Sequence, residues 1–182
     1  MSIANKNLDL SGKKILMIAP CQGKFGGIET FCLTLIEDLL QKGANVRLLR
    51  KKVGCFQDDG SITKNESEIR KSLPTKQNSN FQSEYIEPRD KIIRIAISQS
   101  DLVHLHNPLV EGVWHAKRLG KPCPMTIYNW RRIGLHPRLL VWAWAVRQAD
   151  KRWFISEFVW STWERKKRKN SARLPVVSKI QK

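Results

Sequence analysis

Acidic residues are scarce in this sequence: its 182 residues include 16 aspartates and glutamates against 33 lysines and arginines, which gives a formal net charge of +17. Such an excess of positive charge favours polyanionic partners, namely nucleic acid, acidic phospholipid or phosphorylated substrates. No cluster of carboxylates offers a site for a divalent cation, so we expect no metal site. The charge by itself specifies no fold.

Close cysteine pairs and long apolar runs are missing as well. The four cysteines (Cys21, Cys32, Cys55 and Cys123) are scattered, which excludes metal-ligand or redox spacing and favours reduced thiols. No apolar run reaches the ~20 residues needed to cross a bilayer, and residues 1–13 lack the apolar core of a signal peptide. We therefore expect a cytoplasmic protein, either free or peripheral on the inner face of the membrane.

Short apolar runs alternate with segments of helical periodicity. Residues 14–20 form a continuous apolar run, which is typical of a strand buried on both faces of a parallel sheet. A glycine-containing loop over 22–27 precedes a helical pattern over 28–40, which Gly43 closes. Residues 45–49 are a second strand pattern, so this region predicts a βαβ unit.

The same alternation continues along the chain. We expect further strands at 81–86, 102–106, 123–128 and 152–155, and helices at 89–99, 109–119, 139–149 and after an N-cap at Ser156. Residues 51–80 are rich in polar residues and predict a long flexible loop with at most a short helix near 66–73. The fold class is therefore α/β: a Rossmann-like, doubly wound, mostly parallel sheet of about six strands with helices on both faces.

We divide the chain into three parts on this basis. Residues 1–13 are an N-terminal extension, 14–165 a Rossmann-like domain, and 166–182 a basic C-terminal tail.

The loop before the first helix is a candidate site. Ligands of doubly wound sheets bind beyond the carboxyl ends of the strands, and this loop ends in Gly26 and Gly27, followed by Ile28 and Glu29. Glycines let backbone amides approach a ligand, and a helix N-terminus favours an anion. A turn that needs positive φ explains the glycines equally well. The spacing matches neither the dinucleotide fingerprint nor the P-loop.

Four sequence blocks, in order, resemble the N-terminal half of glycosyltransferase family 4. They are 15–20 with 25–31 and 39–46, then 101–108, then 119–131, then 149–159. The family comprises retaining enzymes of the GT-B fold, in which two Rossmann-like domains face each other across a cleft. The resemblance implies that residues 14–165 are the acceptor-side domain, and that Gly26 and Gly27 lie near the donor phosphates.

The resemblance also points to catalytic candidates. His106 ends a His-x-His-Asn pattern and would lie at the cleft edge, although a histidine bonded to neighbouring backbone fits the same position. Relatives often carry a histidine where this chain has Tyr128, which precedes Asn129. An unperturbed phenol with a pKa near 10 exchanges protons poorly at pH 7. We therefore take His106, Tyr128 and Asn129 as the candidates and expect altered acceptor chemistry or reduced catalysis.

In that family the second domain binds a nucleotide-diphosphate sugar through a basic pair and a glutamate-rich motif. After Ser156 this chain has only Glu157 and Glu164 as acids, so we expect that the donor-binding C-terminal domain is absent from it. This half alone is then expected to bind no cofactor and to turn over little, because the departing diphosphate needs charge stabilisation from the other half. A separate C-terminal donor domain is an expected partner.

Six of the seven tryptophans lie between Trp130 and Asn170, among arginines and lysines. Helical periodicity favours a core position for Trp142, Trp144 and Trp153. One interpretation of Trp160, Trp163 and 166–169 is that the missing domain leaves them exposed. The alternative is a membrane-facing surface on which basic residues attract anionic lipid. The residues expected to contact membrane or polyanion are Arg131, Arg132, Lys166, Lys167 and Arg168.

The favoured function is the acceptor-side half of a retaining, sugar-nucleotide-dependent glycosyltransferase that needs a separate donor domain for hexosyl transfer to a glycan or lipid-linked acceptor. One alternative is a non-catalytic membrane- or partner-binding module derived from such a transferase. Another is a basic nucleic-acid-binding protein, which is the least favoured because the charges and aromatics match no known recognition motif.

Overall fold

The computed structural model describes residues 9–75, 79–89, 91–131, 134 and 136–174. They form one sheet of seven strands in the order β3-β2-β1-β4-β5-β6-β7, and every neighbouring pair is parallel. The chain builds outward from β1 to β3, then returns to the other side of β1 and continues to β7. This is the doubly wound, Rossmann-like arrangement that the sequence predicts.

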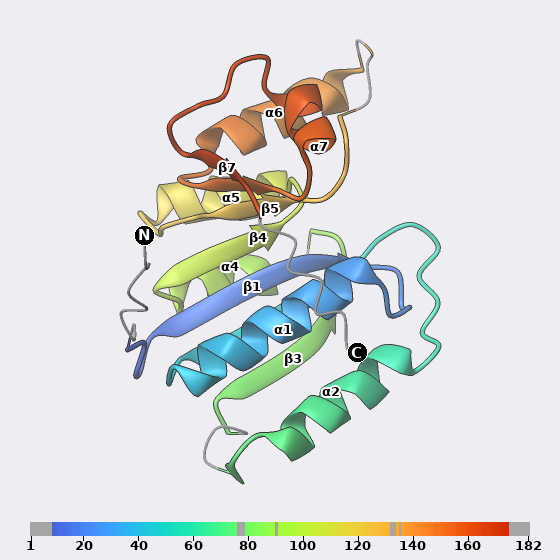
Figure 1. Ribbon diagram of the computed structural model, residues 1–182, viewed down its shortest axis with the longest axis vertical. Coiled ribbons are helices and arrows are strands. Elements are labelled where there is room, and N and C mark those ends of the chain that lie inside the picture. The colour runs from blue at the N-terminus through green and yellow to red at the C-terminus, as the bar shows by residue number, and fades with distance from the viewer. Residues whose placement is uncertain (1–8, 76–78, 90, 132–133, 135, 175–182) are drawn as a thin grey trace, which may run out of the picture.

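The elements carry the labels of Figure 1. The strands are β1 (Lys14–Cys21), β2 (Asn45–Lys52), β3 (Phe81–Ile86), β4 (Leu102–His106), β5 (Met125–Ile127), β6 (Arg152–Phe154) and β7 (Ser171–Arg173). The helices are α1 (Gly27–Gln41), α2 (Ser61–Ser72), α4 (Ile92–Ser98), α5 (Val110–Arg118), α6 (Pro137–Gln148) and α7 (Glu157–Trp163). In Figure 1, α1 and α2 lie in front of the sheet, and α4 and α5 lie behind it.

Each face of the sheet has its own apolar core. Met17 of β1 packs with Ile36 of α1 on one face, whereas Ile18 packs with Leu105 and Val113 in the cluster under α4, α5, α6 and α7. Successive side chains of a strand point to opposite faces. The central strands are therefore buried on both faces, which explains their continuous apolar sequence.

The long loop expected over residues 51–80 is wrong in part, because the structure has regular elements there. Strand β2 continues to Lys52, and the twelve-residue helix α2 follows. Glu66 of α2 is buried, with Oε1 3.0 Å from Nη1 of Arg50 and 3.1 Å from Oγ of Ser83. A buried carboxylate requires such partners. Glu66 therefore faces inward although it is charged, because Arg50 of β2 supplies the opposite charge. This inward acid makes the sequence of α2 look more polar than that of a helix that packs on a core.

The expectation that residues 166–182 form only a basic tail is also partly wrong. Residues 171–173 form β7, which pairs in parallel with β6, so the sheet has seven strands rather than about six. The rest of the tail from 175 onward lies outside the described residues. Strand β7 is short and carries no apolar alternation, so its sequence alone does not identify it.

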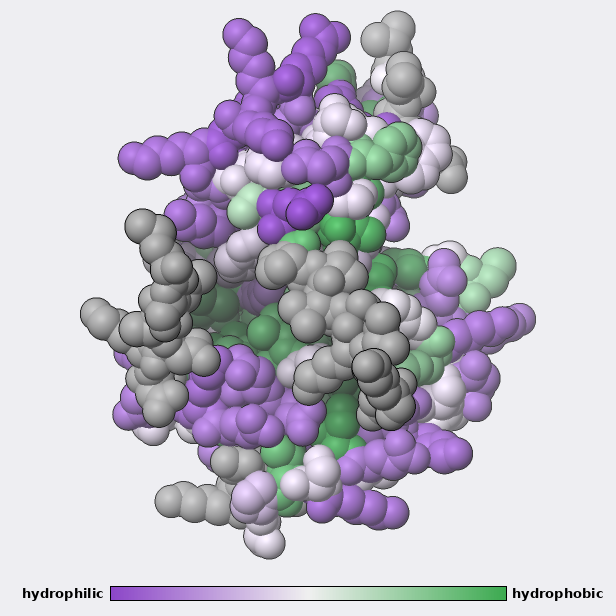
Figure 2. Space-filling view, viewed as in Figure 1, coloured by the Kyte–Doolittle hydropathy of each residue, from purple (hydrophilic) through white to green (hydrophobic). Residues whose placement is uncertain are grey.

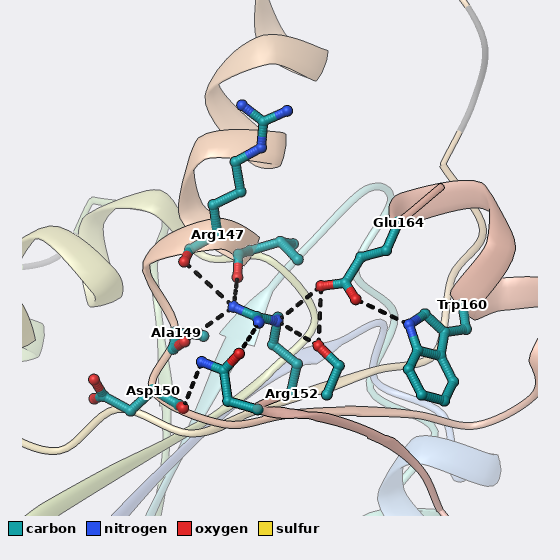
Figure 3. Close-up of polar contacts among 9 residues, drawn as sticks. Arg147, Ala149, Asp150, Arg152, Trp160 and Glu164 are labelled. Atoms are coloured by element: carbon teal, nitrogen blue, oxygen red, sulfur yellow. Dashed lines mark hydrogen bonds and ion pairs between the residues drawn. The ribbon is translucent and has the colours of Figure 1, made fainter. Parts of the chain in front are cut away.

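Arg152 of β6 explains how this edge of the sheet holds together (Figure 3). Its side chain is 2% exposed, and its Nε lies 2.9 Å from Oε1 of Glu164 and 2.8 Å from Oγ of Ser171. The guanidinium also donates hydrogen bonds to three carbonyl oxygens at the end of α6, those of Val146, Arg147 and Ala149. The last carbonyls of a helix have no partner within it. One arginine therefore caps α6 and fixes the segments on either side of it.

Trp160 belongs to the same network. Its Nε1 donates a hydrogen bond of 2.9 Å to Oε2 of Glu164, and its ring stacks on Phe154 with 5.5 Å between centroids. The ring is 7% exposed, so the expectation that an absent domain leaves Trp160 exposed is wrong.

Backbone hydrogen bonds join residues 10–12 to the segment between α1 and β2. The N–H of Leu10 donates to the carbonyl of Lys42 at 2.9 Å, and that of Gly12 to Gly43 at 3.2 Å. Residues 1–8 of the expected N-terminal extension lie outside the described part. None of the helices in the described part is long and apolar enough to span a bilayer.

Candidate functional site

The winding direction of the sheet reverses between β1 and β4, which are neighbours. Ligands of doubly wound sheets bind at such a reversal, beyond the carboxyl ends of the strands. A cavity of about 610 Å³ opens there. Its walls come from the ends of β1, β2 and β4, the loop before α4, and the first turns of α5 and α6.

The cavity combines apolar walls with positive charge. Trp114 of α5 faces it together with Val141 and Trp142 of α6. Its charged residues are Lys51, Arg89, Glu111 and Arg138. Lys51 and Glu111 form an ion pair, whereas the guanidinium groups of Arg89 and Arg138 have no ion-pair partner among the described residues. The cavity therefore suits a ligand with a ring or apolar part and a polar or anionic part.

Backbone strain is concentrated in the same walls. Within the described part of the chain, two residues other than glycine have left-handed backbones, Arg89 with φ 64° and Asn107 with φ 65°, and both line the cavity. Such conformations cost about 1–3 kcal/mol and cluster at functional sites. Asn107 also joins two strand ends, because its Oδ1 accepts from the N–H of Tyr128 at 2.9 Å and of Asn129 at 3.3 Å.

Two of the three catalytic candidates, His106 and Tyr128, are in contact. His106 is 1% exposed, and its Nδ1 lies 2.9 Å from the Tyr128 hydroxyl. Burial, and then the neighbouring His104, lowers the pKa of His106 well below 6.5. Burial raises the pKa of Tyr128 above 10. Both groups are neutral near pH 7, so their contact is a hydrogen bond between uncharged groups and not an acid–base pair.

A second histidine lies beside this pair on the same strand. The rings of His104 and His106 are 4.4 Å apart between centroids, and Nε2 of His104 lies 2.9 Å from Oγ1 of Thr126. Burial lowers the pKa of His104 to about 4. Phe31 of α1 contacts the rings of both His106 and Tyr128 edge-on, with centroids 6.1 Å and 5.9 Å away. The first turns of α1 therefore reach the ends of β4 and β5.

The glycine loop lies at the start of α1 and does not line the cavity. Gly26 precedes the helix, and no side chain caps the first N–H groups. Ile28 packs partly into the core below α1, and Glu29 stands in the first turn. A Cβ added at Gly27 would meet no atom within 4 Å. The backbone at the start of α1 is therefore open to approach.

Gly23 in the same loop has a packing role instead. Its φ is 87°, and a Cβ there would lie 1.8 Å from the carbonyl oxygen of Gln57. The loop is also held by the N–H of Phe25, which donates to Oγ of Ser61 at 2.8 Å. Gly23 is therefore explained by a turn that needs positive φ, whereas Gly27 fits a backbone that a ligand can approach.

The remaining predicted residues lie away from the cavity. Asn129 is exposed, and its carbonyl accepts a hydrogen bond of 2.8 Å from Nε1 of Trp163. The N–H of Arg131 donates to Oγ1 of Thr162 at 3.0 Å. Arg132 lies outside the described residues.

The basic cluster after α7 is exposed at Lys166, Lys167 and Arg168. Lys167 is engaged, with Nζ 3.2 Å from Oε1 of Glu157 and 4.7 Å from the ring centroid of Trp160. None of the three lines the cavity. Their contact with a membrane or polyanion stays a prediction.

Sequence reasoning missed most of the cavity walls. Lys51, Arg89, Trp114 and Arg138 come from four separate segments that only the fold brings together. Trp142, expected in the core, is 38% exposed. Asn107 was identifiable in principle, since asparagine is among the residue types other than glycine that most readily adopt a left-handed backbone. Among the described residues, no group of three or more His, Cys, Asp or Glu side chains is placed to hold a metal ion.

Several solved structures resemble this chain, among them a galactosyltransferase and a translation initiation factor. The apo form of the lipopolysaccharide outer core galactosyltransferase WaaB is 15% identical with a TM-score of 0.47, and the match covers 80% of this chain. The translation initiation factor eIF-2B of Pyrococcus horikoshii OT3 is 7% identical with a TM-score of 0.40, over 65% of this chain. The matched region is 40% of the length of each of those chains. No curated protein sequence matches this one significantly.

The sequence profile of Glycosyltransferase Family 4 matches residues 25–178, which is most of the chain. The match includes the start of α1, the ends of β4 and β5 and the whole of the cavity wall contributed by α5 and α6. The chain therefore belongs to glycosyltransferase family 4.

Proposed function

We propose that this chain is the acceptor-side half of a retaining, sugar-nucleotide-dependent glycosyltransferase, and that the cavity between β1 and β4 receives the acceptor. The observation that carries this proposal is the cavity of about 610 Å³ at the reversal of the sheet, with Arg89 and Asn107 held in left-handed conformations in its wall. Family membership supplies the reaction class, which is sugar transfer.

The walls suit a glycan or lipid-linked acceptor. Trp114 and Trp142 offer flat apolar faces on which a sugar ring can stack. Arg89 and Arg138 offer planar, charged donors that suit hydroxyl, phosphate or carboxylate oxygens. These features favour an acceptor that has both a ring and a polar or anionic group.

We propose that the donor, a nucleotide-diphosphate sugar, binds to a separate domain. The uncapped start of α1 at Gly26 and Gly27 would face its phosphates, because free N–H groups and the helix dipole favour an anion there. The leaving diphosphate also needs cationic groups from the donor domain. Transfer is therefore proposed to require both halves.

The neutral state of His106 and Tyr128 favours a second candidate function. Neither group titrates near pH 7, so neither is suited to take a proton from an acceptor hydroxyl. A chain that binds the acceptor or a partner without transferring sugar would have this arrangement. In the favoured function, the pair positions the end of β5 and does not exchange protons.

The test combines the chain with a donor domain. The chain is coexpressed with a donor-binding Rossmann-like domain taken from a glycosyltransferase of the same family, and transfer from labelled uridine- and guanosine-diphosphate sugars to glycan and lipid extracts is measured. We expect transfer only with both halves, with retained anomeric configuration by NMR. The variants Trp114→Ala and Arg138→Ala are expected to raise the acceptor KM, whereas Lys64→Ala on α2 should not.

Three outcomes decide between the candidates. Acceptor binding without transfer by any pair favours the non-catalytic module. Inversion of configuration contradicts the retaining mechanism. Transfer with an unchanged acceptor KM in the two cavity variants contradicts the assignment of the cavity.

A further inference from the structure

The two helical layers of this protein differ sharply in charge. Helices α1 and α2 contain five carboxylates and three lysines or arginines. Helices α4, α5 and α6, which pack with α7 against the other core, contain one carboxylate and five lysines or arginines. That carboxylate, Glu111, is already paired with Lys51. The α4–α6 layer is therefore positive with almost no compensating negative charge.

Exposed apolar side chains show the same asymmetry. Nine large hydrophobic residues are exposed in the described part of the chain, and none of them lies in α1 or α2. Hydrophilic side chains cover much of the surface over those two helices in Figure 2. Six of the nine belong to the α4–α6 layer or directly follow one of its helices: Ile95, Trp114, Leu119, Leu140, Val141 and Trp142.

The two properties coincide on the same helices. Leu140 is 63% exposed and lies two residues from Arg138 at the start of α6, which is also exposed. Trp114 is 54% exposed on α5, whose end carries Arg118. Arg94 lies next to Ile95 on α4. Arg94, Arg118 and Arg138 have no ion-pair partner among the described residues.

We propose that the α4–α6 layer docks on the surface of an anionic lipid bilayer. Tryptophan and aliphatic side chains are favourable at the headgroup boundary, and cations near it gain about 1 kcal/mol each from anionic lipid. Nucleic acid would pair with the cations but would leave Ile95, Leu140 and Val141 against a charged backbone. The combination of exposed aliphatic residues with unpaired cations, and almost no carboxylates, matches a bilayer.

Docking in this orientation would bring the candidate site to the membrane. Trp114, Arg138, Val141 and Trp142 belong to both the layer and the cavity wall. The mouth of the cavity would then open at the level of the lipid headgroups. A lipid-linked acceptor could enter without leaving the bilayer, and this last consequence rests on the proposed function, whereas the docking itself does not.

The experiment is vesicle flotation with two compositions, phosphatidylcholine alone and phosphatidylcholine with phosphatidylglycerol. We expect binding to the anionic vesicles only, weakened by salt. Leu140→Ser should reduce binding several-fold, and its matched control is Phe158→Ser on α7, because the two side chains are 63% and 64% exposed. Arg94→Gln with Arg118→Gln should reduce binding by about 25-fold, at about fivefold per cation, whereas Lys64→Gln with Lys71→Gln on α2 should not.

The depth of Trp142 gives a second readout. Brominated lipids should quench the fluorescence of the parent protein more than that of Trp142→Phe. The assignment is overturned if Phe158→Ser weakens binding as much as Leu140→Ser, or if Lys166→Gln with Lys167→Gln abolishes binding while the layer variants do not. Absence of binding to anionic vesicles, or capture of double-stranded DNA in their place, overturns the proposal outright. None of these readouts measures sugar transfer, so they fail or succeed independently of the proposed function.

Discussion

The hydroxyl of Tyr128 lies 2.9 Å from Nδ1 of His106, across the ends of two neighbouring parallel strands. Nε2 of His106 is buried and has no hydrogen-bond partner within the described part. The ring therefore depends on one hydrogen bond to satisfy its polar atoms. The contribution of this hydrogen bond can therefore be measured as a change in the free energy of unfolding.

Replacing Tyr128 by Phe should destabilise the protein. The substitution leaves both ring nitrogens of the buried His106 unpaired, which costs about 1–3 kcal/mol in the free energy of unfolding. The matched control is Tyr85→Phe, because the Tyr85 hydroxyl is buried and already has no partner. Urea denaturation of both variants measures the difference. Equal losses would show that the His106 hydrogen bond contributes nothing specific.

Stability should fall as the pH is lowered from about 6.5 toward 4. In the unfolded chain His104 titrates near 6.5, whereas burial lowers its pKa in the folded state to about 4. Between these values the unfolded state binds more protons, so the free energy of unfolding decreases with falling pH and is independent of His104 above 6.5. The effect of this group is roughly 3 kcal/mol at most.

The variant His104→Gln isolates this contribution. Its side chain can still bond Thr126 but does not titrate, so the slope of stability against pH in this interval should be smaller than in the parent. The difference between the two slopes reports His104, because every other titratable group is common to the two proteins. The control is His115→Gln, on α5. An identical slope in His104→Gln and the parent would contradict the assignment.

Removing Glu164 should cost far more than removing an exposed ion-pair partner. Glu164→Leu leaves the buried guanidinium of Arg152 without its anion, which lowers the free energy of unfolding by about 3–5 kcal/mol. The control is Lys117→Ala, whose exposed pair with Asp150 should contribute less than about 1 kcal/mol. Thermal and urea unfolding report both. A small loss in Glu164→Leu would mean that the carbonyl oxygens at the end of α6 suffice for Arg152.

Two glycines of one loop should respond in opposite ways. Gly23→Ala places a Cβ 1.8 Å from the carbonyl oxygen of Gln57 on a left-handed backbone, so stability should fall by roughly 2 kcal/mol or more. Gly27→Ala meets no atom within 4 Å and lies in the first turn of α1, so stability should hold or rise.

The same pair tests the donor-phosphate role of the loop. In the proposed complex of this chain with a donor domain, Gly27→Ala should raise the KM for the nucleotide sugar, because a methyl group would stand where we propose that the phosphates approach the backbone. Calorimetric stability is measured alongside. An unchanged KM would assign both glycines to packing alone.

Much of the fold was predictable because local sequence reports burial directly. The apolar run of β1 and the helix after it, closed by Gly43, predicted the first βαβ unit, and Ser156 caps α7 with its Oγ 3.1 Å from the N–H of Val159. The class of the sheet followed from the alternation of strands and helices. Helix α2 did not, because its buried Glu66 looks like a surface residue until Arg50 is placed beside it.

The candidate site was predictable in outline and not in composition. His106 and Tyr128 were identified at two strand ends, and the fold brings them into contact. The glycine loop was identified at the first strand end but lies outside the cavity. Arg89, Trp114 and Arg138 line the cavity, but no local sequence pattern common to them identifies them as wall residues. The reason is that a parallel sheet brings together loops that are far apart in the chain.

By itself the sequence determined the chemistry available: a large positive charge, few carboxylates, many tryptophans and an α/β alternation. These are properties of composition and local periodicity, which do not depend on where distant segments meet. Only the tertiary structure decided that the positive charge and the exposed apolar residues share one helical layer, and that His104 and His106 are too deeply buried to be charged near pH 7. Burial and electrostatic pairing are set by contacts between segments, and those contacts exist only after the chain has folded.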